Sequence, residues 1–151
     1  MTLNIIKNYT FFGYKVEGFN YISNMIFISS INKYFILGID DTRIPNQQSN
    51  NPTHYNNAKW AYGTLHYNHT FIPDSSGILH NIINRAYDCI YIEKYNRIYG
   101  LGDYKDFTTP DKGVLLKWNV NINSSDISFD MSYIFTFHFN KTPLSGVVKS
   151  L

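Results

Sequence analysis

The clearest pattern in the chain is a strict alternation of apolar and mostly polar positions over residues 127–139. Successive side chains of a β-strand point to opposite faces, so a period of two predicts a long strand with one face in the core. A helix would scatter the same large side chains around its circumference. The residues that we place on the core face are Ile127, Phe129, Met131, Tyr133, Phe135, Phe137 and Phe139.

The same alternation occurs over residues 114–122, immediately before this strand. Here Val114, Leu116, Trp118, Val120 and Ile122 share one face, and the polar run 123–126 that follows has the length of a hairpin loop. The two segments are therefore predicted to form a long antiparallel hairpin, and we expect both apolar faces to be core.

Other segments also have strand patterns. Residues 34–39 are a continuous apolar run, typical of a central strand covered on both sides. Further strands are predicted at 10–16, 19–28, 58–67 with an extension to 70–72, and 88–93, while 78–84 fits either a strand or one helical turn. No internal repeat or linker is evident. We predict an all-β, single-domain protein over residues 1–151, an antiparallel β-sandwich of jelly-roll or Ig-like type.

Three segments lack any period. Residues 40–57 are polar and contain two prolines, which predicts a long loop, and residues 73–77 predict a turn. Residues 95–112 contain Gly100, Gly102 and Pro110 and predict a second irregular connection. Long loops in compact domains often bind ligands or partners, so function is expected in 40–57 and 95–112.

Composition agrees with this class and narrows the functions. Hydrophobic residues make up 44% and aromatic residues 17% of the 151 positions, which is ample for a core. The net charge is only +2 and the basic residues form no cluster, so we expect no nucleic-acid partner. The N-terminus lacks the apolar run of a signal peptide, and no segment is long enough to span a bilayer, so we expect a cytoplasmic protein without a membrane partner.

Few residues suggest chemistry. Cys89 is the single cysteine, so no intramolecular disulfide can form, and we expect it to be buried. His66 and His69 would share a face on a helix but point to opposite faces on a strand, so neither a metal site nor a cofactor is expected. No catalytic signature is present, and we predict that the protein is not an enzyme.

Asp40 and Asp41 stand where an apolar strand leads into the first loop. Carboxylates at such places serve as acid–base groups, metal ligands or loop anchors. Adjacent strand residues diverge, so an Asx-turn that anchors the loop is the favoured interpretation. His54 lies farther along the same loop. The remaining alternative is a small metal-dependent enzyme built on Asp40, Asp41, His54, His66 and His69.

Tyr95, Tyr99 and Tyr104 lie in the second irregular segment among charged and polar residues. Exposed tyrosines bind partners well, because the ring is apolar and its hydroxyl forms hydrogen bonds. The predicted sites of ligand binding or self-association are therefore Asp40, Asp41, His54, Tyr95, Tyr99 and Tyr104. The partner is either another copy of the chain, as a homo-oligomer or lattice, or a glycan bound as in a lectin.

Short motifs resemble one known family. Residues 35–42, Phe-Ile-Leu-Gly-Ile-Asp-Asp-Thr, followed by Asn-Asn-Pro-Thr at 50–53, look like the opening of the bacterial PixA/AidA inclusion-body protein family. Residues 77–79 leading to 88–91 resemble its next strand pair, and 116–139 resemble its closing hairpin. The first 34 residues lie outside the match, and residues 140–144 replace the family's Trp-Asp-Pro element. The resemblance implies a cofactor-free β-sandwich stored in cytoplasmic inclusions or crystals.

Overall fold

The computed structural model describes residue 19 and residues 21–40, 57–67, 70–79, 83–104 and 112–138. Its first half contains β1 (Tyr21–Ile28), the 3₁₀ turn η1 (Ser29–Ile31), β2 (Lys33–Asp40), β3 (Asn57–Leu65) and β4 (Phe71–Ile78). Its second half contains β5 (Ile83–Ile92), the 3₁₀ turn η2 (Glu93–Tyr95), β6 (Arg97–Tyr104), β7 (Lys112–Asn121) and β8 (Asp126–His138).

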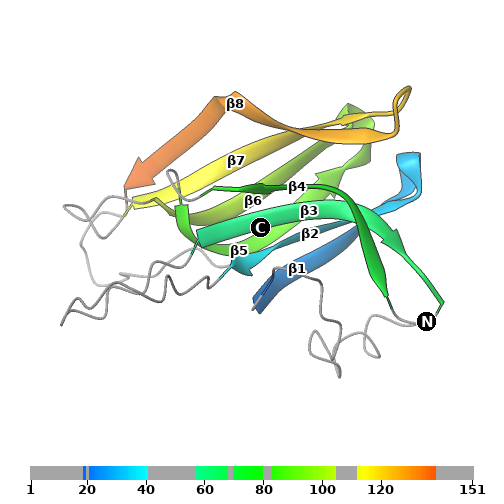
Figure 1. Cartoon of the computed structure of the whole chain (residues 1–151). Helices are drawn as coiled ribbons and strands as arrows, with labels where there is room; N and C mark the ends of the chain where they lie inside the picture. The colour runs from blue at the N-terminus through cyan, green and yellow to red at the C-terminus, as the bar shows by residue number, and fades with distance from the viewer. Residues whose placement is uncertain are drawn as a thin grey trace.

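The strands form two four-stranded antiparallel sheets, which we call the first sheet (β1-β2-β3-β4) and the second sheet (β5-β6-β7-β8) (Figure 1). The all-β antiparallel class is confirmed. Hydrogen-bonded neighbours in each sheet are also consecutive strands in the chain, so each sheet is an up-and-down meander. Among these strands, the Greek-key order expected for a jelly-roll or Ig-like domain is therefore not the order observed.

A fully buried tryptophan joins the two sheets. The Trp118 ring on β7 lies 5.1 Å from the Phe35 ring on β2 and 6.3 Å from the Trp60 ring on β3, measured between centroids. Its third aromatic neighbour is Phe129 on β8, at 5.3 Å. Edge-to-face and tilted pairs at these distances are favourable beyond the area they bury. The two sheets thus share one core.

Several predicted strands are confirmed. The apolar run 34–39 is the inner strand β2, in which Phe35, Ile36 and Leu37 are all completely buried. The segments at 19–28, 58–67 and 88–93 coincide with parts of β1, β3 and β5. The extension of the second of these segments to 70–72 is wrong, because β4 begins at Phe71 and runs antiparallel to β3. The predicted hairpin is β7 and β8, with its turn at 122–125. The segment 10–16 lies outside the described residues, as do residues 41–56 and 105–111 of the two expected loops.

The turn predicted at 73–77 is wrong, because these residues belong to β4. Pro73 pairs with Gly63 and Ser75 with Tyr62, and the register shifts between Tyr62 and Gly63. Strand β4 is the last strand of its sheet. A proline has no amide hydrogen to donate, which is tolerated at a sheet edge. Residues 73–77, which are typical of a turn, therefore lie in an edge strand and include its bulge.

The irregular connection predicted at 95–112 is also wrong in its first part. Tyr95 ends η2, and residues 97–104 form the strand β6 between β5 and β7. Gly100 marks close packing rather than a turn. A Cβ at this position would lie 2.7 Å from Cζ3 of Trp118, so only glycine leaves room for the indole.

Strand β8 exists as predicted, but its aromatic face is not core throughout. Trp118 pairs with Phe129 and Leu116 pairs with Ile134, so β8 contains three more residues than β7 between these pairs. An odd number of extra residues exchanges the two faces of a strand. Accordingly Ile127 is buried, whereas Met131 is 67% exposed and Phe135 is 58% exposed. The side chains of Tyr133, Phe137 and Phe139 lie outside the described residues.

The two halves contain the same hairpin, although no internal repeat was expected. In each, the second strand follows a 3₁₀ turn that ends in a left-handed asparagine, Asn32 with φ 53° and Asn96 with φ 51°. The strand register shifts at corresponding positions, between Ile22 and Asn24 in β1 and between Ala86 and Asp88 in β5. The offset is 64 residues, as between Asn24 and Asp88. Within the hairpins β1–β2 and β5–β6, the residues identical at this offset are Ile26 and Ile90, Ile28 and Ile92, Asn32 and Asn96, Leu37 and Leu101, and Gly38 and Gly102.

Removing the shared tryptophan tests this core. We expect Trp118→Ala to lower the free energy of unfolding by about 3–5 kcal/mol, the usual cost of emptying a large aromatic site. Ile122→Ala is the control, because Ile122 is 49% exposed in the β7–β8 turn, and it should change stability by less than about 0.5 kcal/mol. Urea unfolding measures both values, and equal losses would contradict the proposed core.

Candidate functional site

Three predicted site residues lie in or beside the first long loop. Asp40 is the last residue of β2, and its main chain pairs with Asn57 of β3. Its side chain lies outside the described residues, as do Asp41 and His54. The pairing places Asp40 at the end of a regular ladder, but a role in ligand binding stays a prediction.

The three predicted tyrosines do not share one loop. Tyr95 lies in η2 and is 58% exposed, with Nζ of Lys94 5.3 Å from the centre of its ring. Tyr99 is a residue of β6 whose backbone partners are Ile90 and Lys117. Tyr104 ends β6, and its side chain lies outside the described residues. Tyr95 therefore belongs to a turn and Tyr99 to a sheet.

Among the thiol and imidazole groups, the structure describes Cys89 and His66. Cys89 is buried, and burial raises the pKa of its thiol far above the ordinary range, so it stays protonated. His66 is exposed after β3, and His69 lies outside the described residues. Within the described ranges, no three His, Cys, Asp or Glu side chains gather as metal ligands.

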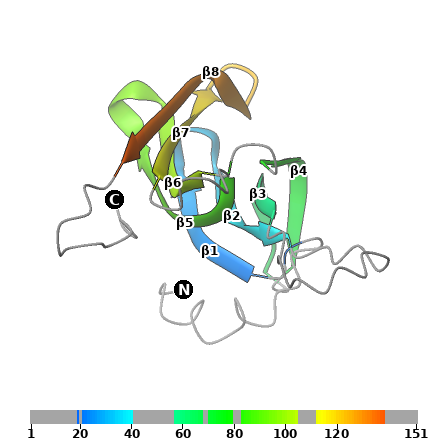
Figure 2. The ribbon, with the colours of Figure 1, turned by 90° about the vertical axis from the view of Figure 1, so that its left-hand side faces the viewer.

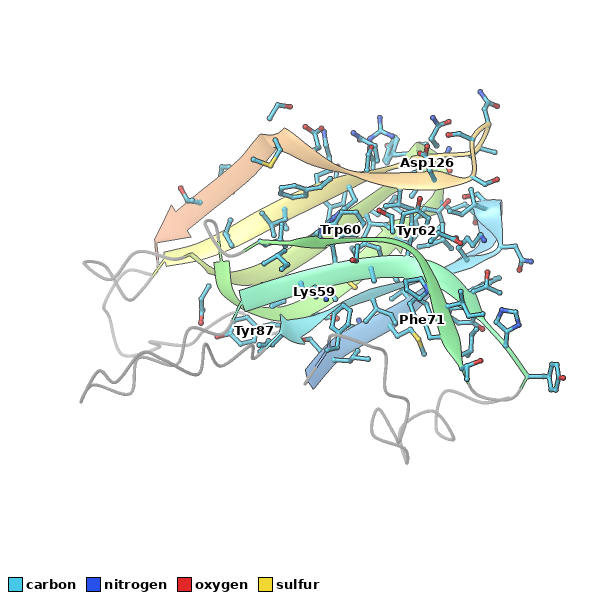
Figure 3. The ribbon with its side chains drawn as sticks, viewed as in Figure 1. Lys59, Trp60, Tyr62, Phe71, Tyr87 and Asp126 are labelled. Atoms are coloured by element: carbon cyan, nitrogen blue, oxygen red, sulfur yellow. The ribbon has the colours of Figure 1, made fainter. Side chains whose placement is uncertain are left out.

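Each sheet has an inner face toward the other sheet and an outer face away from it. Figure 3 shows this at β3, where Trp60 and Tyr62 lie on one side and Lys59 lies on the other. Trp60 and Tyr62 belong to the shared core and stack at an interplanar angle of 5°. Lys59 lies over the ring of Phe19, outside that core. Alternation along β3 therefore separates the two faces.

The outer face of the second sheet has an apolar centre, with Arg97, Lys117 and Asn119 on the same side. Backbone pairing aligns Ile90 with Tyr99, Leu101 with Leu115, and Leu115 with Phe135, and paired residues project from the same side of a sheet. We define this outer face by Ile90, Tyr99, Leu101, Leu115, Lys117 and Phe135. Leu101 is buried, but Phe135 is exposed. A neighbouring molecule would find an apolar surface here.

An aspartate organises the bulge beside this face. The Asp130 carboxylate lies 2.8 Å from Nζ of Lys117 and accepts hydrogen bonds from the Ser132 amide at 3.1 Å and the Ser132 hydroxyl at 2.6 Å. It also accepts a 3.5 Å bond from the Asn119 amide group. The contact with Lys117, followed by those with Ser132, holds the pKa of the Asp130 carboxyl well below its usual value. These contacts hold Met131 at the surface, between two anchored residues.

Polar side chains join the edges of the two sheets. The Asn24 amide group donates to the Asp88 carboxylate and, at 3.1 Å, to the Cys89 carbonyl oxygen. The Ser23 hydroxyl donates to the Ala86 carbonyl oxygen, and the Ser29 hydroxyl donates to Glu93. Strands β1 and β5 therefore lie side by side, as Figure 2 also shows. They run in the same direction, because the partner on β5 advances along the chain with the residue on β1. Side chains of β1 satisfy carbonyl groups at the edge of β5.

Two features of the sequence, neither of which entered the predicted sites, indicate parts of this arrangement. Asp130 and Ser132 are polar residues opposite the aromatic positions, and Asp-x-Ser is a pattern in which a side chain bonds its own main chain two residues on. Residues identical at an offset of 64, such as Asn32 and Asn96, are the sequence signal of the repeated hairpin. The other residues of the outer face of the second sheet are brought together by the register of the strands, which the sequence does not indicate.

The ionisation of Asp130 gives a prediction on pH. A carboxyl whose pKa is depressed on folding stabilises the fold at pH values above its ordinary pKa of about 3.9 and loses this contribution as pH falls. We expect Asp130→Asn to be less stable than the natural chain at pH 7, with the difference shrinking toward pH values of about 2.5. Urea midpoints at several pH values measure this. The control is the Lys117→Met variant, in which the further change Asp130→Asn should lower stability by less than it does in the natural chain. If the stability difference between the natural chain and Asp130→Asn is the same at all pH values, the ion pair has no such role.

The polar junction between β1 and β5 gives a second prediction. Asn24→Ala removes both hydrogen bonds and leaves acceptors unsatisfied at a half-buried site, so we expect a loss of about 1–3 kcal/mol. Asn24→Asp should be at least as unstable, because it places a carboxylate beside Asp88. The control is Asn123→Ala in the exposed β7–β8 turn. If thermal unfolding gives equal stabilities for Asn24→Ala and Asn123→Ala, the junction contributes nothing.

Comparison with protein-family models, curated proteins and solved structures returns no match to this chain. The resemblance to the PixA/AidA family therefore stays a prediction. In the described part of the chain, no helix has the length and apolar character needed to cross a membrane.

Proposed function

We propose that this chain is a non-enzymatic protein that associates with copies of itself and accumulates in cytoplasmic inclusions. The observation that supports this most is the exposure of Phe135, 58%, and of Met131, 67%, at and beside an apolar sheet face. Exposing such side chains to water is unfavourable, and contiguous apolar surface of this kind is typical of interaction sites.

The charge of the chain supports association with like molecules. A net charge of +2 over 151 residues provides little repulsion between copies. The ion pair between Lys117 and Asp130 also lies beside the apolar face and is already formed within one chain. The Lys117–Asp130 pair therefore presents no net charge to a second copy, while Arg97 remains a positive group on the same face.

A lectin-like function has less support. Sugar binding by tyrosine uses the open face of the ring, and Lys94 lies over the Tyr95 ring at 5.3 Å. Tyr99 is only partly exposed within the outer face of the second sheet. Both tyrosines are therefore engaged by neighbours in the same chain.

Self-association is tested by the dependence of mass on concentration. We expect sedimentation velocity to show assemblies that grow with concentration, and Phe135→Glu to weaken the association by about tenfold or more, because it would bury a charge. Ile122→Glu is the matched control, since Ile122 is exposed in the β7–β8 turn and should leave the association unchanged. Electron microscopy of expressing cells should show dense bodies.

A natural chain that stays monomeric at high concentration and dispersed in cells would disprove the proposed function. An equal loss of association in Phe135→Glu and Ile122→Glu would remove the outer face of the second sheet as its site.

A further inference from the structure

Each sheet of the chain has two edge strands, β1 and β4 in the first sheet and β5 and β8 in the second. An edge strand turns every second main-chain N–H and C=O group away from its single partner, and these groups can pair with another chain. Proteins protect such edges with a covering element, a proline, a bulge or a charged side chain. The four edges of this chain differ in this protection.

Three of the four edges are protected. Strands β1 and β5 cover each other, because the Asn24 amide group of β1 donates to the Asp88 carboxylate of β5. Strand β4 contains Pro73, which has no amide hydrogen to offer a further strand. It also contains Asp74, whose carboxylate lies 2.8 Å from Nζ of Lys33. A proline, a bulge and a charge therefore stand along the edge of β4.

Strand β8 carries such a device only in its first part, where Asp130 holds a bulge through Lys117 and Ser132. Residues 131–138 contain no Asp, Glu, Lys, Arg, Pro or Gly and are rich in aromatic and β-branched side chains. Segments of this composition readily pair as strands. Figure 1 shows β8 as the outermost strand of its sheet, with a bend partway along it. Among the strands that the structure describes, none pairs with its far side.

The second part of β8 is exposed on both faces. Phe135 and Thr136 are consecutive, so they project from opposite faces of the sheet, and both are exposed. Their partners on β7 are Leu115, which is half-buried, and Val114, which is fully buried. Burial therefore decreases from β7 to the edge on both faces, and the side chains of an added strand would have room on each.

The charge pattern favours a second copy of β8 as the strand that fits this edge. When a strand pairs with its own copy, side chains of like charge are brought together near the two-fold axis, which is unfavourable. Residues 131–138 contain no Asp, Glu, Lys or Arg, so two copies can pair without this repulsion. An antiparallel register centred on Thr136 places Thr136 opposite its copy and Phe135 opposite Phe137. Threonine pairs and aromatic pairs across strands are favourable.

We propose that residues 131–138 of β8 pair antiparallel with the same residues of a second copy, about a two-fold axis near Thr136, which joins the two second sheets into one continuous sheet. This mode of assembly rests on the proposed function. An axis perpendicular to the sheet keeps both outer faces on the same side. The Phe135 side chains of the two copies then extend one apolar surface, through which dimers associate further.

A charge at the centre of the proposed pairing tests it. Thr136→Lys brings two lysines together at the axis, and we expect it to weaken dimer formation by about tenfold. Ser128→Lys is the matched control, because Ser128 is exposed on the same strand before the bulge and the charge change is the same. Its two copies would lie roughly 50 Å apart in the dimer, so dimer formation should not change. Sedimentation velocity measures both variants, after circular dichroism confirms folding.

Cross-linking gives a second measurement, which does not require the pairing to be weakened. A bifunctional maleimide with a short spacer should join two copies of Thr136→Cys, because the two thiols meet at the axis. It should not join two copies of Ser128→Cys at concentrations where the dimer is the main species. The natural chain is the blank, since Cys89 is buried and should not react.

The outcomes separate the mode of pairing from the proposed function. If the natural chain associates, the two lysine variants associate equally and the two cysteine variants cross-link alike, pairing through β8 is wrong while self-association holds. If the natural chain stays monomeric at high concentration, both the proposed function and the pairing through β8 are wrong.

Discussion

The packing of Trp118 against Gly100 is the contact on which the rest of the structure depends. A side chain at position 100 would overlap the indole, and the space left by glycine lets Trp118 reach Phe35 and Trp60 of the other sheet. Neither four-stranded meander could bury its apolar face alone, since a sheet needs a second layer to exclude water. Trp118 supplies this contact, because it belongs to the second sheet and packs against Phe35 and Trp60 of the first. The polar junction of β1 with β5 sets the relative direction of the sheets.

Strand β8 shows how one local change moves a residue from core to surface. Three additional residues near Asp130 change which side of the sheet the rest of the strand presents. Asp130 holds this bulge through Lys117 and Ser132, and in doing so it exposes Met131 and Phe135. The aromatic alternation that looked like a core therefore becomes, in its second half, a surface available to a partner.

The repeated hairpin connects the fold with its proposed function. Natural repeat architectures bury their apolar faces by stacking neighbours, and a unit at the end of a stack has one face uncovered. Here the repeat has two members, so each has one inner face covered by the other and one outer face. The outer face of the second sheet, where Phe135 is exposed, is the surface that the proposed self-association would use.

The sequence by itself determined the strands, because alternation in 114–122 and 127–139 and the apolar run at 34–39 follow from the two-residue period of a strand. It did not determine the register, since the bulges at Asp130 in β8 and at Asp74 in β4 depend on pairing with other strands. For the same reason Gly100, Pro73 and Gly77 have the character of turn residues but lie in strands, where a neighbour's side chain or a sheet edge explains them. Which faces are core and which are surface was decided only by tertiary structure, because burial depends on the residues that register brings opposite one another.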